Sequence, residues 1–298
     1  MNKLYTHNDL DGVSCAILAK LAYKDDIDIE YCSNPAEVST KLSNNTKQYD
    51  KIFVTDCSFD CDIPSDNIYV FDHHHTAINL LTKIKHADIR EYYNNRLTCG
   101  TELFYQYLIK CNLIHNIDFF VEQVRLYDTW DWTKSTSKLP KYLNMLMYIL
   151  SADTFVSIFT ERLVKQDVNE LTIFNQHERD LLTYEVTRQQ QDIEKSLAHI
   201  TTIKTSKYTL GIIVGDYNMS SLGNAMCERY NIDIAVGINL MRGIVSVRTQ
   251  RDDIDLGKLM KATGNGDGHA KSAGCLLDLD YNKIYNNIIG DIFGEIIA

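Results

Sequence analysis

Short apolar runs alternate with helically spaced apolar residues over the first 110 residues. Runs rich in β-branched and aromatic side chains predict buried strands at 3–6, 27–31, 52–55 and 68–71. Apolar residues three and four positions apart predict helices at 13–23 and 98–109, whereas the polar stretch 32–48 predicts neither. Strands that alternate with helices are typical of βαβ units. We therefore expect an α/β fold with a mostly parallel sheet flanked by helices.

A helical segment follows, and the α/β alternation then returns. Residues 117–126 show helical spacing, and a polar, Gln-rich stretch without Pro or Gly predicts one long connecting helix. Its apolar stripe consists of Leu171, Phe174, Leu181, Leu182, Val186, Ile193 and Leu197. Later elements are predicted as strands at 208–214, 233–238 and 244–248, a helix at 222–229 and a glycine-dense loop at 264–269. We place the domain boundary inside the connector, which gives domains 1–185 and 186–298, the second a smaller α/β domain.

Composition narrows the class of protein. With 45% hydrophobic and 23% charged residues among 298, the chain is typical of a globular protein with a proper core. It contains no apolar run long enough for a membrane span and no secretory signal, so we expect a cytoplasmic protein without a membrane partner. The eight cysteines are scattered without a CxxC pair, Cys57 and Cys61 being closest, and are expected to be reduced.

The net charge of −10 argues against a general duplex-DNA binder, whose affinity depends on neutralising many phosphates. It does not exclude a small phosphorylated substrate, because bound divalent cations would invert the local field.

Acidic and imidazole side chains follow three of the predicted strands. The first strand runs into His7, Asp9 and Asp11, the third ends at Asp56, and the fourth ends at Asp72-His73-His74-His75. In an extended backbone residues i, i+2 and i+4 share one face, and open α/β sheets bind ligands at the carboxyl ends of their strands. Carboxylates and imidazoles gathered there would be costly to bury unless divalent cations neutralise them.

A mixed oxygen and imidazole donor set favours manganese over magnesium, cobalt or zinc, and two such ions can activate water for attack at phosphorus. Separate explanations also exist for each strand end. Asp9 and Asp11 would serve as helix N-caps, Asp56 as a turn cap, and the histidines as a solvated loop. Convergence at one metal site accounts for all three ends together. The remaining histidines have no evident partner and are interpreted as structural or surface residues: His75, His86, His115, His177 and His199.

Five segments, in order, resemble the motifs of the DHH phosphoesterase superfamily. HNDLDG (residues 7–12), VTDCS (54–58), FDHHH (71–75) and YDTWDW (127–132) are similar to its four metal-site motifs, and GDGHAKSAG (266–274) to the glycine-rich signature of its accessory DHHA1 domain. The superfamily includes RecJ-type exonucleases, short oligoribonucleases (nanoRNases), cyclic-dinucleotide phosphodiesterases and family II inorganic pyrophosphatases. The resemblance implies a DHH domain, a DHHA1 domain and an active site in the cleft between them.

The resemblance also implies a role for each matching residue. Two divalent metal ions would be bound, the first by His7 and Asp9, the second by Asp11, His73 and Asp128, with Asp56 bridging them. His74 would contact the reacting phosphate, and Asp72 would orient the neighbouring imidazoles. Asp131 competes with Asp128 for the fourth motif, where Asp-Thr is the usual pair.

In the second domain, Gly264, Gly266 and Gly268 would let backbone N–H groups approach an anion, while Arg248 and His269 would bind a non-scissile phosphate. Residues 204–271 carry nine Lys or Arg against seven Asp or Glu, which concentrates positive charge there. Two segments depart from the pattern: Asp267 replaces the middle glycine of the usual triplet, and residues 96–102 keep little of the family's Ser/Thr-rich helix start.

These features predict a manganese-dependent phosphodiesterase, a phosphoric ester hydrolase of the oligoribonuclease type that acts on short single-stranded RNA. Alternatives are hydrolysis of cyclic or linear dinucleotides or of 3′-phosphoadenosine 5′-phosphate, RecJ-like exonuclease activity on single-stranded DNA, and a nucleotide sensor without catalysis. The sequence is compatible with a monomer or a homodimer.

Overall fold

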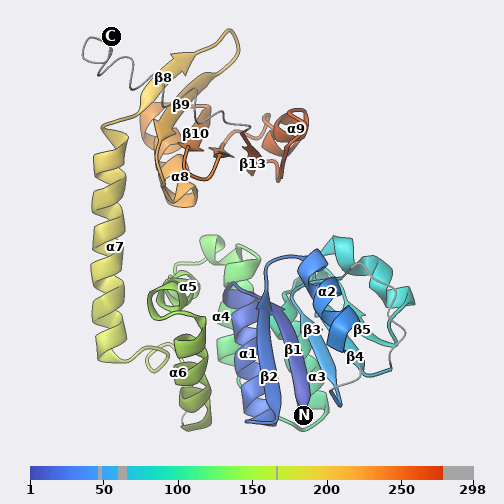
Figure 1. The fold of residues 1–298 in the computed structure, drawn as a ribbon. Coiled ribbons are helices and arrows are strands. Elements are labelled where there is room, and N and C mark those ends of the chain that lie inside the picture. Colours follow the sequence, from blue (N-terminus) through green and yellow to red (C-terminus); the bar gives the residue numbers. More distant parts are fainter. Residues whose placement is uncertain (46–48, 60–65, 166, 278–298) are drawn as a thin grey trace, which may run out of the picture. The chain divides into compact units, whose positions relative to one another are not determined.

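The computed structural model describes residues 1–45, 49–59, 66–165 and 167–277 (Figure 1). The chain divides into two compact units, Met1–Thr183 and Tyr184–Ala298, each with its own sheet. Among the described residues no helix is both long and apolar enough to cross a bilayer.

The first unit is built on a parallel sheet of five strands. They are β1 (Asn2–His7), β2 (Ile27–Cys32), β3 (Ile52–Thr55), β4 (Ile68–Asp72) and β5 (His86–Ile89), in the order β2-β1-β3-β4-β5. Every neighbouring pair is parallel. All carboxyl ends therefore lie on one edge, as the alternation of strands and helices predicts.

Alternate strand residues divide the core of this unit into two layers. Leu4, Phe53 and Phe71 pack into one cluster with the main helices, whereas Tyr5, Val54 and Val70 pack into another with the smaller elements on the opposite face. The first layer contains α1 (Leu10–Tyr23), α3 (Gly100–Lys110), α4 (Asp118–Asp128), α5 (Leu139–Leu150) and α6 (Ala152–Lys165). The second contains α2 (Pro35–Asn45) and the 3₁₀ helix η1 (His75–Thr82). The short elements β6 (Tyr92–Tyr93), β7 (Arg96–Leu97) and η2 (Asp131–Lys134) complete the unit.

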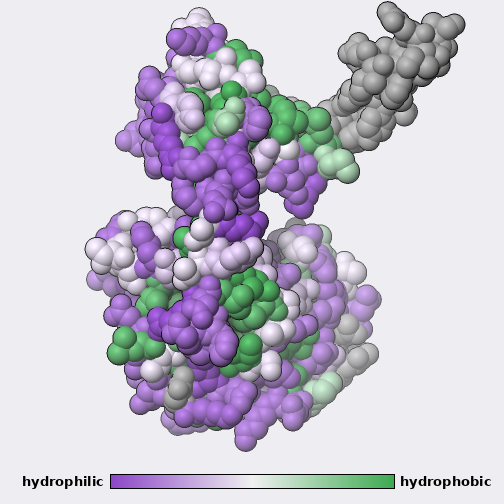
Figure 2. All heavy atoms as spheres, turned by 90° about the vertical axis from the view of Figure 1, so that its left-hand side faces the viewer, coloured by the Kyte–Doolittle hydropathy of each residue, from purple (hydrophilic) through white to green (hydrophobic). Residues whose placement is uncertain are grey.

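The long helix predicted for the connector is confirmed, but its predicted apolar stripe is not. The helix α7 (Gln176–Leu197) begins after Leu171 and Phe174, which precede it in a turn, and Leu181 and Val186 are 43% and 37% exposed. Leu182 packs in the core of the first unit and Leu197 in that of the second, so the expected stripe faces no single core. Figure 2 looks towards this helix, whose visible side chains are mostly hydrophilic. The polar stretch 32–48 is also helical in part, because Val38 and Leu42 of α2 are buried.

The second unit contains a mixed sheet of six strands. In chain order they are β8 (Thr201–Lys204), β9 (Thr209–Val214), β10 (Ile234–Asn239), β11 (Ile244–Arg248), β12 (Gly266–Gly268) and β13 (Ser272–Leu276), with α8 (Met219–Tyr230) and α9 (Leu256–Lys261) between them. Only β9 and β10 pair in parallel. The glycine-dense segment, expected as a loop, forms the short edge strand β12 paired with β13.

The described cysteines are free thiols, four of them buried. Cys61, one of the closest pair in sequence, lies outside the described residues, as do 278–298 of the predicted second domain.

Candidate metal centre

The end of β1 and the start of α1 supply three polar side chains. Asp9 is the N-cap of α1: its Oδ1 accepts from the Gly12 amide at 3.0 Å, while its Oδ2 lies 2.8 Å from His7 Nδ1. Capping and the metal-site arrangement are therefore compatible for this residue. Asp11 lies inside the first turn of α1, not on an extended segment, and is 1% exposed. The helical turn, rather than strand alternation, brings Asp11 to the site.

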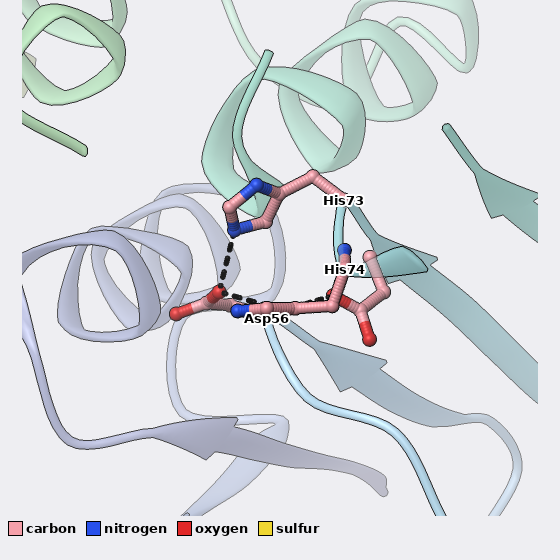
Figure 3. A group of neighbouring side chains, drawn as sticks. Asp56, His73 and His74 are labelled. Atoms are coloured by element: carbon pink, nitrogen blue, oxygen red, sulfur yellow. Dashed lines mark hydrogen bonds and ion pairs between the residues drawn. The ribbon is translucent and has the colours of Figure 1, made fainter. Parts of the chain in front are cut away.

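Asp56 directly follows β3 and adopts an unusual backbone conformation. Its φ of 51° lies in the left-handed region, which costs a non-glycine residue about 1–3 kcal/mol. The side chain is 2% exposed, and its Oδ1 lies 3.3 Å from His73 Nε2. Figure 3 shows the ring of His73 pointing at this carboxylate. The strained turn places a charged group where solvent cannot reach it, which is typical of a ligand position.

The carboxyl end of β4 supplies the next group. Asp72 is fully buried, and its Oδ1 accepts from the His74 amide at 3.1 Å and lies 2.8 Å from His74 Nδ1. His73 turns towards the carboxylates, whereas His74 is held by Asp72 and its side chain is 52% exposed. His75 begins η1 and is exposed.

The two aspartates of the fourth motif have different surroundings. Asp128 ends α4, and its Oδ2 lies 3.5 Å from His73 Nε2. Asp131 instead pairs with Arg125 at 2.9 Å and with Lys134 at 2.7 Å. The structure therefore brings Asp128, and not Asp131, to the other acidic residues.

Ligand atoms of these residues form three groups in which all atoms lie within 4.8 Å of one another. The groups are His7, Asp9 and Asp56; Asp11, His73 and Asp128; and Asp56, Asp72, His73 and His74. Asp56 belongs to two of them. Four buried polar atoms here have no hydrogen-bond partner in the described part of the chain: Asp56 Oδ2, Asp72 Oδ2, His73 Nε2 and Asp128 Oδ2. Buried polar atoms normally have a hydrogen-bond partner, so four that lack one at a single site are consistent with ligands of bound cations.

The pKa shifts of the clustered residues are also consistent with a cation site. Burial, together with the charges of Asp11 and Asp9, raises the pKa of Asp128 to about 8, and the pKa of Asp56 is raised well above its usual range by the same causes. Burial lowers the pKa of His73. Without cations the ionised carboxylates repel one another, and divalent ions would remove that repulsion.

Asp9 and His74 have pKa shifts opposite to those of Asp128 and His73, because each has a hydrogen-bonded partner of opposite charge. Burial is the largest influence on Asp9 and opposes its ionisation, but the hydrogen bond and charge of His7, together with the hydrogen bond from the Gly12 amide, lower the pKa of Asp9 to about 2. Across the site, the hydrogen bond to Asp72 raises the pKa of His74 to about 9.

Two residues at the start of α3 belong to the site and are not among the sequence candidates. The amides of Gly100 and Thr101 donate to the two carboxylate oxygens of Asp11 at 2.6 and 2.7 Å. A Cβ at Gly100 would lie 2.8 Å from the Cβ of Asp56, so only glycine allows this approach. In the sequence, the Thr-Cys-Gly-Thr segment at 98–101 is the feature that marks this position, although it departs from the family motif.

The predicted phosphate-binding residues lie in the second unit. Arg248 donates to Val247 O at 2.8 Å and to Ser220 Oγ at 3.3 Å, and within the described residues no carboxylate pairs with it. Burial lowers its pKa. His269 is exposed at the turn before β13, where its amide donates to Ser272 O. Gly264 and Gly268 have φ of 84° and 140°, and the backbone O of Met260 would clash with a Cβ at Gly266. The Asp267 side chain lies outside the described part.

The other histidines lie outside the three ligand groups. His86 stacks on Tyr69 with ring centroids 4.4 Å apart, and His115 Nε2 lies 3.0 Å from Leu163 O. His177 and His199 are exposed.

Comparisons with known proteins provide independent evidence about the family and the fold. No protein-family model matches the chain. Oligoribonuclease NrnB of Bacillus subtilis (strain 168) is 30% identical over 311 aligned residues, which cover 98% of this chain and 76% of NrnB. A pGpG-specific phosphodiesterase, PggH from Vibrio cholerae, superposes with a TM-score of 0.56 at 15% identity over 99% of both chains. Exonuclease RecJ bound to manganese superposes with a TM-score of 0.54 at 12% identity, over 99% of this chain and 90% of RecJ. At these identities the two structures show a shared fold.

Proposed function

Because the chain belongs to the DHH phosphoesterase superfamily, together with oligoribonuclease NrnB, we propose that it is a metal-dependent phosphodiesterase of short oligoribonucleotides. The observation that carries the proposal is the set of four buried atoms, on Asp56, Asp72, His73 and Asp128, that have no hydrogen-bond partner in the described part of the chain. Such atoms are expensive in a protein without a ligand and expected in a divalent-metal site.

Two of the three ligand groups support a two-metal assignment. His7 and Asp9 would hold one cation, Asp11, His73 and Asp128 the other, and Asp56, which belongs to the first of these groups and lies 3.3 Å from His73 Nε2, would bridge them. Bound cations would supply Lewis acidity and an activated water for attack at phosphorus. The oxygen-rich set with imidazoles suits manganese, with magnesium and cobalt as weaker candidates.

The chain's own residues supply positioning around the phosphate. Asp72 binds His74 through Nδ1, which leaves Nε2 of this half-exposed ring for the substrate. Gly100 and Thr101 fix the Asp11 carboxylate through their amides, so that it keeps one orientation. Such fixed ligands need no reorganisation when charge develops at the phosphate.

We assign substrate binding to the second unit, as its DHHA1 domain. Arg248 lacks a carboxylate partner among the described residues, whereas the nearby Arg251 pairs with Asp233 and Asp253. An unpaired, partly buried guanidinium suits a phosphate. His269 and the glycines at 264, 266 and 268 would complete this subsite. We also propose that the protein acts in the cytoplasm, as a monomer or as a homodimer.

A substrate panel tests the proposal and separates its alternatives. Purified protein with Mn²⁺ or EDTA is given RNA and DNA of two to five nucleotides, pGpG, a cyclic dinucleotide, 3′-phosphoadenosine 5′-phosphate and pyrophosphate. We expect Mn²⁺-dependent cleavage of the short RNAs and its loss in Asp56→Ala. Preference for long single-stranded DNA would favour RecJ-like activity, and preference for pyrophosphate would refute a phosphodiesterase. Binding of nucleotides without any turnover would favour a sensor.

A further inference from the structure

Three aromatic rings form a cluster immediately after the metal-site residue Asp128. The ring centroids of Tyr127 and Trp130 are 6.4 Å apart, those of Tyr127 and Trp132 are 6.4 Å apart, and those of the two tryptophans are 6.0 Å apart. Tyr127 stacks on both indoles at interplanar angles of 26° and 14°. The family motif accounts for Asp128 and assigns no role to these rings.

Trp130 is placed at a cost that its own packing does not explain. Its φ of 61° lies in the left-handed region, which Gly or Asn adopts readily and a bulky residue rarely does. Its side chain is nevertheless 55% exposed. Hydrogen bonds from the Trp130 amide to Tyr127 O and from Thr133 to Trp130 O hold this turn. A strained backbone that presents a large apolar ring to solvent points to a ligand for that ring.

The position of Trp130 limits what that ligand is. Trp130 follows Asp128 by two residues, so their Cα atoms are at most about 7 Å apart. A planar group stacked on Trp130 would therefore lie near a phosphate at the metal ligands. Nucleobases are planar groups that stack on exposed indoles whatever their sequence.

One cation lies against the rings. Lys138 Nζ lies 5.4 Å from the ring centroid of Trp132. A lysine beside an aromatic cluster favours an anionic ligand that also carries a ring, such as a nucleotide, over an apolar partner.

We propose that Trp130 is the stacking platform for the nucleobase adjoining the scissile phosphate, supported from behind by Tyr127 and Trp132. The inference rests on the proposed function and deepens it, because it makes an unpaired base a required part of the substrate. Stacking tolerates all four bases, so the subsite would select for a base without selecting its sequence.

Kinetics with three matched substrates test the platform. The first is an RNA dinucleotide, and the other two are the same dinucleotide with the first or the second base replaced by hydrogen. Removal of a stacked base corresponds to about a 5- to 150-fold loss of binding. We expect Trp130→Ala to raise KM for the dinucleotide by such a factor, to leave KM for one abasic analogue unchanged, and to change kcat little. Trp130→Phe, which keeps a ring, should restore most of the affinity. An equal effect of Trp130→Ala on all three substrates would overturn the proposal.

Intrinsic fluorescence supplies a readout that does not need turnover. The chain has two tryptophans, so Trp132→Phe leaves Trp130 as the only indole. A dinucleotide with a methylphosphonate linkage, which resists hydrolysis, should quench this variant saturably, whereas Trp130→Phe should show no saturable quenching. Equal quenching of both variants, or none in either, would overturn the platform. If no oligonucleotide is hydrolysed but the quenching follows the prediction, the proposed function fails while the stacking subsite stands.

Discussion

Replacement of Gly100 by alanine tests how tightly the site is built. A Cβ at this position would lie 2.8 Å from Asp56 Cβ and 2.9 Å from Asp56 N. Carbon atoms in good contact are about 3.5–4.0 Å apart, so Asp56 or the start of α3 must move by more than about 0.5 Å. Neither partner is a flexible side-chain tip, because the Asp56 amide donates a hydrogen bond to Phe71 O and the Gly100 amide donates one to the Asp11 carboxylate.

The magnitude follows from that displacement. Overpacking of a rigid contact costs about 1–3 kcal/mol of unfolding free energy. Displacement of groups that orient a metal ligand typically costs about 10- to 100-fold in metal affinity or rate. We therefore expect Gly100→Ala to lower the melting temperature moderately and to weaken Mn²⁺ binding and kcat by about 10- to 100-fold.

Isothermal titration with Mn²⁺, initial rates on an RNA dinucleotide and thermal melting are the assays. Gly211→Ala is the matched control, because its Cβ would meet side-chain atoms of Ile232 and Met226 in the second unit, the nearest being Ile232 Cδ1 at 2.3 Å. The control should lose stability but keep Mn²⁺ affinity. Wild-type affinity and rate in folded Gly100→Ala would refute the claim that this close approach positions Asp56.

Three further outcomes follow from the same geometry. Asp128→Asn should abolish hydrolysis and remove one Mn²⁺. Asp131→Asn should keep both activity and metal, because Arg125 would still pair with Glu122. If metal analysis and rates show the reverse, Asp131 and not Asp128 is the ligand. Since a carboxyl with a pKa of about 8 is protonated at lower pH and must lose its proton to bind metal, Mn²⁺ affinity should fall about 10-fold for each pH unit below 8. Calorimetry from pH 8 to 6 measures this, and a flat profile would contradict it. His269→Ala should raise KM for a dinucleotide with little change in kcat, and steady-state kinetics that show a lower kcat alone would count against a binding role.

Local patterns in the sequence predict the strands and their ends well. Ile52–Thr55 and Ile68–Asp72 are short runs of β-branched and aromatic residues, which form buried strands because no helix could bury so short a run on one face. Polar residues at the end of such runs must share one edge when the strands are parallel. The meeting of Asp56 and His73 was therefore accessible from the sequence.

Other parts depend on contacts that no local pattern carries. Asp11 is fixed by an amide 89 positions away, at Gly100, which only the folded packing of α1 against α3 brings close. The helices α5 and α6 are separated by a single residue, Ser151, with φ of 70° and without Gly or Pro to mark the break. The prediction of one apolar stripe along α7 was wrong because the apolar residues of this helix are divided between two cores.

The central claim is that the clustered ligands hold two divalent cations. Equilibrium dialysis against Mn²⁺, followed by elemental analysis of the protein, measures this most directly. We predict two Mn²⁺ per wild-type chain at saturation and fewer in Asp56→Ala, because the Asp56 carboxylate belongs to two of the three ligand groups. A folded wild-type chain that binds none, or an Asp56→Ala variant that still binds two with unchanged affinity, would contradict the account.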